Sequence, residues 1–269
     1  MTDTSDYSQP KRSDFWRRVG ALLIDSIIVL LPLQILVMVL YAQTNGAVQG
    51  TFGFTTTICY SVSALPEGIK LDPPPPADYD SITDCHTGLL GFDMSRELVI
   101  SKSTEQGSVT TTVSQTYTLG PDSVPRTAWS MDIPAIIIFL AYLIFMEFKS
   151  GSTFGKRAVK IRAVDIADVT RSGLPLRKAI QRNLAMWIGS IPGLLVLALL
   201  FFKSLQAAPN FSGVFFFVAI AFIIQLGWTI WIIVSVSQKN DPIYDQLAAT
   251  AVIRVETKPV SAPTQSAQP

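Results

Sequence analysis

An aspartate inside a long apolar run is the residue of this sequence that most directly suggests a chemical role. The run covers residues 15–42 and places Asp25 after two arginines, Arg17 and Arg18. At roughly 1.5 Å per residue, a helix of this length can cross the ~30 Å hydrocarbon core of a bilayer. A carboxylate there costs about 2.5–3.5 kcal/mol on insertion scales, so we expect another group of the protein to bind it.

Other residue types that carry catalysis are scarce. The chain has two cysteines and one histidine, and no nucleophile–base pair or metal-ligand spacing is recognisable. The segment 151–165 resembles a phosphate loop only superficially, because its glycine spacing is one residue short and Arg157 replaces the hydroxyl residue. We therefore predict no enzyme activity, no cofactor, no metal site and no nucleic-acid partner.

The composition indicates a membrane protein. Only 15% of the 269 residues are charged, against about 25% in an ordinary soluble domain, and the mean hydropathy is +0.37. The first apolar run exceeds the roughly 7–15 residues of a signal-peptide core, so we interpret it as a retained helix. We predict an α-helical membrane protein with four transmembrane helices, at residues 15–41, 129–148, 183–202 and 213–237.

The segments between these helices differ in kind. Residues 42–128 are rich in threonine and valine, whose β-branched side chains favour strands. We expect a β-rich insert with strands within 51–63, 97–103 and 108–119. The other divisions are a disordered N-terminus at 1–14, a basic segment at 149–182, a turn at 203–212 and a tail at 238–269.

Basic residues near the membrane predict which side each segment faces. The 149–182 segment contains nine Lys or Arg residues and the N-terminus adds four, whereas the 203–212 turn has only Lys203. The positive-inside rule places both termini and the basic segment in the cytoplasm and leaves the insert outside. We expect the basic segment to contact anionic lipids, at about 1 kcal/mol per basic residue near the surface.

Both cysteines, Cys59 and Cys85, fall in the insert that is predicted to lie outside, where disulfides persist. A bridge would close about 27 residues and contribute roughly 3–4 kcal/mol in the loop-entropy model. A metal site that includes His86 has no recognisable spacing. We therefore predict a disulfide.

Two short alternating stretches predict a small β-ribbon on the cytoplasmic side. In the first, Val159, Ile161 and Ala163 share one face, and residues 250–256 alternate in the same way. Each stretch is too short to be stable alone, so we expect the two to pair. The pair would tie the segment after the second helix to the end of the chain.

Three stretches of the sequence, taken in their order along the chain, resemble a known family. They are FWRRVGALLID at 15–25, GSTFGKRAVKIRAVD at 151–165 with RNL at 182–184, and DPIYDQLAATAVI at 241–253. Together they resemble the RDD family of bacterial membrane proteins, which is named for an arginine and two aspartates. These would correspond to Arg18 (or Arg17), Asp25 and Asp245, accompanied by Gly155, Lys156 and Arg157.

The resemblance implies a multi-pass protein of the bacterial inner membrane. The insert is longer than the loop usual in the family, and Tyr244 stands where members often have histidine. The biochemistry of the family is mostly unassigned, and a transport role has been suggested for it.

The partner of Asp25 decides between two interpretations. Arg18 is seven residues away, about 10.5 Å along a helix axis, which is long for a direct contact. The cations that enter from the same side are Lys156, Arg157 and Arg182, and Asp245 is placed to join them. Either these charges form an ion-pair clasp that fixes helix packing, or Asp25 binds a transported cation or proton.

Two functional hypotheses follow. In the first, the protein is a non-catalytic envelope component whose external β-rich insert binds a protein partner through strand edges. In the alternative, it is a small transporter or ion-permeation protein that uses Asp25. A second copy of the chain is a further possible partner.

Overall fold

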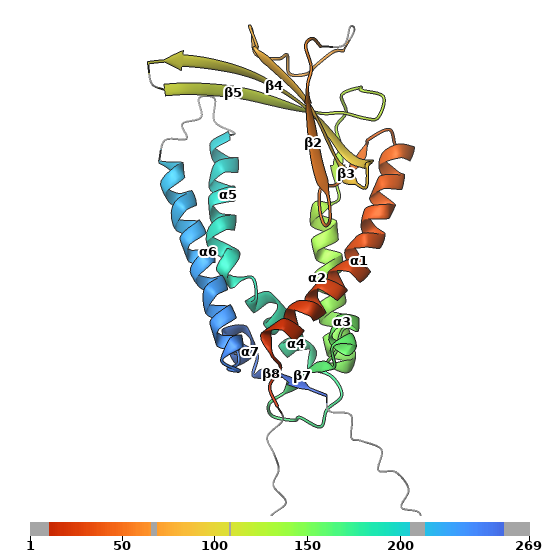
Figure 1. The fold of residues 1–269 in the computed structure, drawn as a ribbon, viewed down its shortest axis with the longest axis vertical. Coiled ribbons are helices and arrows are strands. Elements are labelled where there is room, and N and C mark those ends of the chain that lie inside the picture. Colours follow the sequence, from red (N-terminus) through yellow and green to blue (C-terminus); the bar gives the residue numbers. More distant parts are fainter. Residues whose placement is uncertain (1–10, 66–68, 108, 205–212, 256–269) are drawn as a thin grey trace, which may run out of the picture. The chain divides into compact units, whose positions relative to one another are not determined.

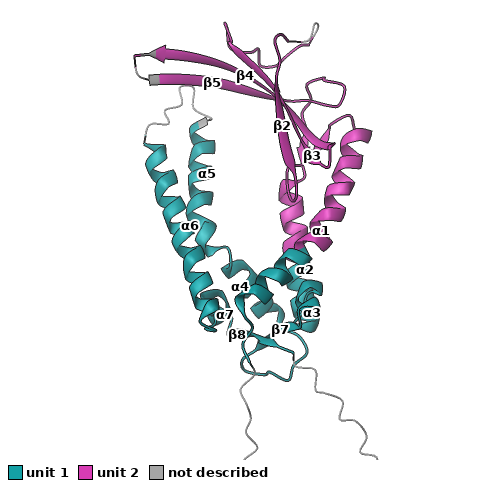
Figure 2. Ribbon diagram, in the orientation of Figure 1, with its two compact units in different colours: residues 1–25, 141–269 teal, residues 26–140 magenta. Residues whose placement is uncertain are grey.

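The computed structural model describes residues 11–65, 69–107, 109–204 and 213–255 (Figure 1). The chain divides into two compact units, residues 26–140 and residues 1–25 with 141–269 (Figure 2). We call the second of these unit 1 and residues 26–140 unit 2, and describe each by itself. The division crosses two helices, α1 (Phe15–Gln43) and α2 (Asp132–Ser150).

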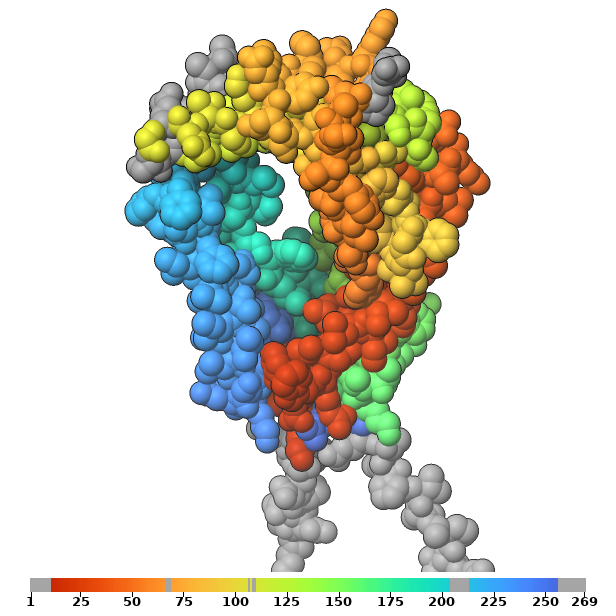
Figure 3. All heavy atoms as spheres, turned by 45° about the horizontal axis from the view of Figure 1, so that its top comes forward, coloured from red at the N-terminus to blue at the C-terminus, as the bar shows by residue number. Residues whose placement is uncertain are grey.

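Four helical spans of the described chain are long and apolar enough to cross a membrane, as predicted. They are Phe15–Gln43, Asp132–Ser150, Leu176–Lys203 and Val214–Ser237. Their large apolar side chains face outward: in α6 (Val214–Ser237), seen in blue on the surface in Figure 3, Phe215 is 83% exposed. Such surfaces suit lipid, where a helix satisfies its own backbone hydrogen bonds.

The third span begins earlier than predicted, at Leu176 rather than at residue 183. It consists of α4 (Leu176–Ala185), a 3₁₀ turn at Ile188–Ser190, and α5 (Ile191–Ser204). The basic residues of α4 concealed its helical character, because its buried face is formed by Ala179, Arg182, Asn183 and Ala185 rather than by large apolar side chains.

Unit 2 is built on a four-stranded antiparallel sheet in the order β2–β3–β4–β5. Its strands are β2 (Thr56–Ser61), β3 (Ser81–Leu89), β4 (Phe92–Gln106) and β5 (Val109–Thr118). Three of them fall in or overlap the stretches predicted as strands. Sequence reasoning missed β3, which contains Asp84, His86 and Gly88, residues of modest strand propensity. Pairing with β2 on one side and β4 on the other holds it extended.

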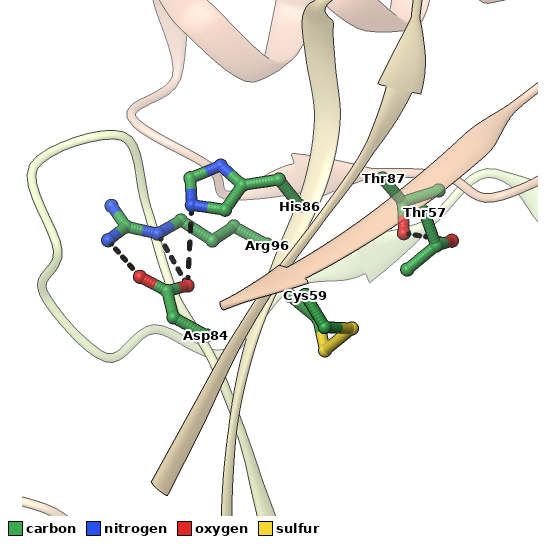
Figure 4. The surroundings of a disulfide bond; sticks show 7 residues. Thr57, Cys59, Asp84, His86, Thr87 and Arg96 are labelled. Carbon is green, nitrogen blue, oxygen red and sulfur yellow. Dashed lines mark hydrogen bonds and ion pairs between the residues drawn. A yellow bond between two sulfur atoms is a disulfide. The ribbon is translucent and has the colours of Figure 1, made fainter. Parts of the chain in front are cut away.

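The two faces of this sheet differ because side chains alternate along each strand. One face carries the core, formed by Ile82, Leu98, Ile100, Tyr117 and Leu119. The other face carries the disulfide between Cys59 and Cys85, which lie directly opposite each other in β2 and β3 (Figure 4). The predicted disulfide is confirmed, and it fastens an edge strand to its neighbour.

A second pairing in unit 2 precedes α2. The short strand β1 (Val48–Gln49) runs parallel to β6 (Trp129–Ser130). The prediction that the second helix begins at residue 129 is therefore wrong. Residues 129–131 precede the helix, and α2 begins at Asp132. The Trp129 backbone N–H is used instead, donating to the Ala47 carbonyl at 2.8 Å.

Unit 1 contains the predicted ribbon, in which β7 (Ile161–Asp165) pairs antiparallel with β8 (Thr250–Arg254). Ile161, Ala163 and Val252 of the ribbon pack with Ala21 of α1 and Ala179 of α4. The ribbon thus packs against both α1 and α4.

The prediction of a disordered segment over 1–14 is wrong for residues 11–13. The Ser13 N–H donates to the Val252 carbonyl at 2.9 Å, and the Arg254 N–H donates to the Lys11 carbonyl at 3.0 Å. The cause is the second edge of β8, whose backbone groups offer partners to the incoming chain. Residues 1–10, 205–212 and 256–269, in the predicted N-terminus, turn and tail, lie outside the described residues.

Candidate functional site

A chain of buried ion pairs lies in unit 1, contributed by α1, α2, α4 and α7 (Ile243–Leu247) and by the short helix α3 (Phe154–Ala158). We call it the charge network; its members are Arg18, Asp245, Arg182, Glu147 and Lys156. Asp245 accepts from Arg18 Nη1 at 2.7 Å through Oδ2 and from Arg182 Nε at 2.5 Å through Oδ1. Both of its oxygens are thereby engaged.

Glu147 forms the other half of the network. Its Oε1 accepts from both Arg182 and Lys156, and its Oε2 accepts from Asn183 Nδ2 at 2.9 Å. Arg182 thus lies between two carboxylates, and its guanidinium carbon is 5.7 Å from the centre of the Tyr244 ring. Glu147, Arg182 and Asp245 are all buried, so the pairs compensate a desolvation cost of several kcal/mol per ion.

Burial shifts the pKa of Lys156, a member of the network, and of Tyr244 beside it. Burial lowers the pKa of Lys156, and the charge of Glu147 opposes that effect. Burial raises the pKa of Tyr244, so its hydroxyl stays neutral at physiological pH. That hydroxyl is 3.5 Å from Arg18 Nη1, from which it accepts a hydrogen bond.

Asp25 does not belong to this network. Its oxygens accept from Tyr142 Oη at 2.7 Å, Thr153 Oγ1 at 2.5 Å and the Gly155 N–H at 2.8 Å. We had expected Lys156, Arg157 or Arg182 to bind it, yet within the described residues Asp25 forms no ion pair. Neutral donors replace the cation because α3 brings a hydroxyl and a backbone N–H directly against α1.

Gly155 makes this approach possible. A Cβ atom on Gly155 would lie 2.0 Å from the Ala21 carbonyl oxygen and 2.9 Å from the Asp25 carboxyl carbon. Thr153 caps α3 with its side chain, which accepts from the Lys156 N–H at 3.2 Å. The glycine of the G-K-R stretch is therefore required by packing. The next residue, Lys156, belongs to the charge network.

The two remaining arginines of the predicted cluster lie outside the charge network. Arg17 Nη1 donates to the Val159 carbonyl at 2.9 Å, and Arg157 Nη2 donates to Ser150 Oγ at 2.8 Å. Both contacts join neighbouring elements of unit 1. Neither arginine has a carboxylate partner among the described residues.

Glu147 is a site residue that the sequence pattern did not predict. Its signal was present, since an acid stands inside the second apolar run, but its position near the end of that run made it resemble an interfacial charge. A cavity of about 210 Å³ adjoins the network, and Asp25, Glu147 and Lys156 all line it. Among the described residues, no group of three or more His, Cys, Asp or Glu side chains is placed to hold a metal ion.

We predict that Glu147→Gln lowers the stability of the protein by about 3–5 kcal/mol, because it leaves Arg182 and Lys156 buried without a full counter-charge. Thermal unfolding in detergent, followed by tryptophan fluorescence, measures the loss. Glu97→Gln is the matched control, at an exposed carboxylate of β4. Equal unfolding temperatures for the two variants would show that the network contributes little.

We predict that Gly155→Ala destabilises the protein by about 1–3 kcal/mol, because the added methyl group cannot fit against the α1 backbone. Gly227→Ala in α6 is the control, since a Cβ there meets no atom within 4 Å. The same unfolding measurement applies to both. A Gly155→Ala variant as stable as the wild type would refute the tight contact between α3 and α1.

Comparison with known proteins found a family model that matches part of the chain. Residues 126–249 match the model of the RDD family, a segment that includes Glu147, Gly155, Lys156, Arg182 and Asp245. It excludes Arg18, Asp25 and the sheet of unit 2. No curated protein and no solved structure matches the chain. RDD proteins are membrane proteins, and this protein is an integral membrane protein that is similar to the RDD family over residues 126–249.

Proposed function

We propose that this protein is a non-catalytic component of the bacterial inner membrane that presents the β-sheet of unit 2 outside the cytoplasm to a protein partner. The observation that carries the proposal is the exposed edge strand β2. It pairs with β3 alone in the described sheet, and all six of its residues are exposed. Its outer backbone groups are therefore available to a further strand.

The sequence of β2 lacks the usual protection of an edge. Natural edge strands carry charges, proline or bulges that prevent pairing with other chains, whereas β2 reads TTICYS and is uncharged. Ile58 and Tyr60 are 50% and 57% exposed. Both lie on the face that carries the sheet core. Their partners in β3 are His86 and Asp84, which are on the same face as the core residue Ile82 because side chains alternate along a strand.

Polar residues of β3 and β4 lie beside the β2 edge and form hydrogen bonds and ion pairs with one another. Asp84 accepts from Arg96 Nη2 at 2.6 Å, a hydrogen bond that lowers the pKa of the Asp84 carboxyl group. His86 lies between Asp84 and Asp93 and forms an edge contact with Tyr60. A partner strand beside β2 would place alternate side chains next to Ile58 and Tyr60, which supplies specificity in addition to backbone pairing.

The proposed orientation rests on charge and on the disulfide. The basic residues of 149–182 favour the cytoplasmic side, where they contact anionic lipids. The bond between Cys59 and Cys85 favours an oxidising compartment for unit 2. Under this proposal the charge network is a clasp that holds the helix ends together, and a second copy of the chain is one candidate partner.

We expect Ile58→Lys to reduce binding of the partner about tenfold or more, because a charge on an edge strand blocks strand addition. A photo-crosslinking residue placed at Thr57 reports binding as the yield of adduct in intact cells. The control is Val113→Lys on the opposite edge strand β5, where Val113 is 58% exposed. An adduct that survives Ile58→Lys, or that both variants abolish equally, would count against β2.

The alternative function is transport of a proton or cation through Asp25, favoured by its burial beside the cavity. Under it, Asp25→Asn abolishes ion flux into vesicles while the protein stays folded. Tyr142→Phe is the control, because it removes one hydrogen bond to Asp25 and keeps the carboxylate. Loss of the folded protein together with flux would instead assign Asp25 a structural role.

A further inference from the structure

The cavity beside the charge network has two chemically different walls. It has a volume of about 210 Å³, and all its lining residues belong to unit 1. The apolar wall is formed by Phe15, Val19, Leu22, Leu143, Met186 and Ile232. The polar wall is formed by Arg18, Asp25, Glu147, Lys156 and Arg182. A ligand that fits must therefore combine a polar group with an apolar body.

The acceptors of the polar wall are already engaged. Each oxygen of Asp25 accepts a hydrogen bond from a hydroxyl or backbone donor. Each oxygen of Glu147 accepts from Lys156, Arg182 or Asn183. The same holds for Asp245, which adjoins the wall and accepts from Arg18 and Arg182. A bare cation would have to displace one of these donors.

Donors, in contrast, remain unused. The Arg18 side chain is only 12% exposed, and its Nε is buried without a hydrogen-bond partner. Among the described residues Lys156 Nζ contacts one acceptor, Glu147, whereas an ammonium group has three N–H bonds to donate. A buried donor without a partner is costly, so both groups gain from an added acceptor.

The pairing of the network points the same way. Arg18, Lys156 and Arg182 are three cations, and they are paired with the two carboxylates Glu147 and Asp245. Asp25 is a third carboxylate at the cavity, but its oxygens accept from neutral donors rather than from these cations. The three cations therefore share the oxygens of two carboxylates, which leaves N–H groups for a further acceptor.

We propose that this cavity binds the anionic headgroup of a membrane lipid. Arg18 and Lys156 donate to a phosphate oxygen, a contact that the planar guanidinium suits well. The first part of an acyl chain lies against Val19, Leu22 and Ile232. A lipid rather than a soluble anion is favoured because the apolar wall belongs to helices that are long and apolar enough to cross a membrane.

The test uses the full chain purified in a neutral detergent and titrated with phosphatidylglycerol. Bound lipid is counted by native mass spectrometry, and the affinity comes from the rise in unfolding temperature. Phosphatidylcholine with the same acyl chains and inorganic phosphate are the comparison ligands. We expect phosphatidylglycerol to bind about tenfold or more tightly than either.

Two variants locate the binding site. Arg18→Lys keeps a cation beside Asp245 but removes the buried Nε, and Val19→Phe fills the apolar end without touching a charge. We expect each to weaken phosphatidylglycerol binding about tenfold. The matched controls are Arg17→Lys, whose guanidinium contacts Val159, and Ile27→Phe, at an exposed position of α1. Neither control should change the affinity.

Each contrary result overturns a different part of the proposal. Equal binding of phosphatidylcholine would remove the requirement for an anion. Equal stabilisation by inorganic phosphate would remove the requirement for a lipid. Unchanged affinity in Val19→Phe, which tests the cavity even if Arg18→Lys fails to fold, would exclude this site. Equal weakening by Arg17→Lys would indicate binding to surface charge only.

Discussion

Arg182 lies between two buried carboxylates, and the arrangement of unit 1 depends on this double ion pair. Asp245 and Glu147 come from elements that are far apart in the sequence, and Arg182 contacts both. Removing any one of the three leaves an uncompensated charge away from water. The ends of α2, α4 and α7 are therefore held at one place, and Arg18 and Lys156 extend the constraint to α1 and α3. The apolar spans require this, because lipid supplies little drive for helices to associate with one another.

Asp25 follows a different physical rule. Its carboxylate accepts hydrogen bonds from two hydroxyl groups and one backbone N–H, which are brought to it by α2 and by α3 with its N-cap residue. Hydrogen bonds of this kind stabilise a carboxylate without a cation. The intramembrane acid thus does not need the charge network, and the network keeps its excess of donors. This separation favours an anionic ligand over a bare cation at the cavity.

Unit 2 solves a different problem, that of keeping a small sheet folded while one edge stays open. The disulfide joins β2 to β3 at opposed positions, and the core lies on one face. An edge strand without charges is an aggregation hazard unless something covers it. The proposed binding of a partner at β2 would account for both the missing protection and the covalent attachment of that strand to β3.

The sequence by itself determined the properties that depend on neighbouring residues. Four apolar runs predicted the four membrane-length helices, alternation predicted the pairing of β7 with β8, and the count and placement of two cysteines predicted their bond. Only the tertiary structure decided the partners of the buried charges. Arg18 meets Asp245 across 227 positions and Asp25 meets Tyr142 across 117, and no local pattern encodes such a choice. Glu147 and β3 escaped prediction for the same reason: hydropathy and propensity are summed over short windows, whereas the burial of an ion or a polar strand is decided by what folding brings beside it.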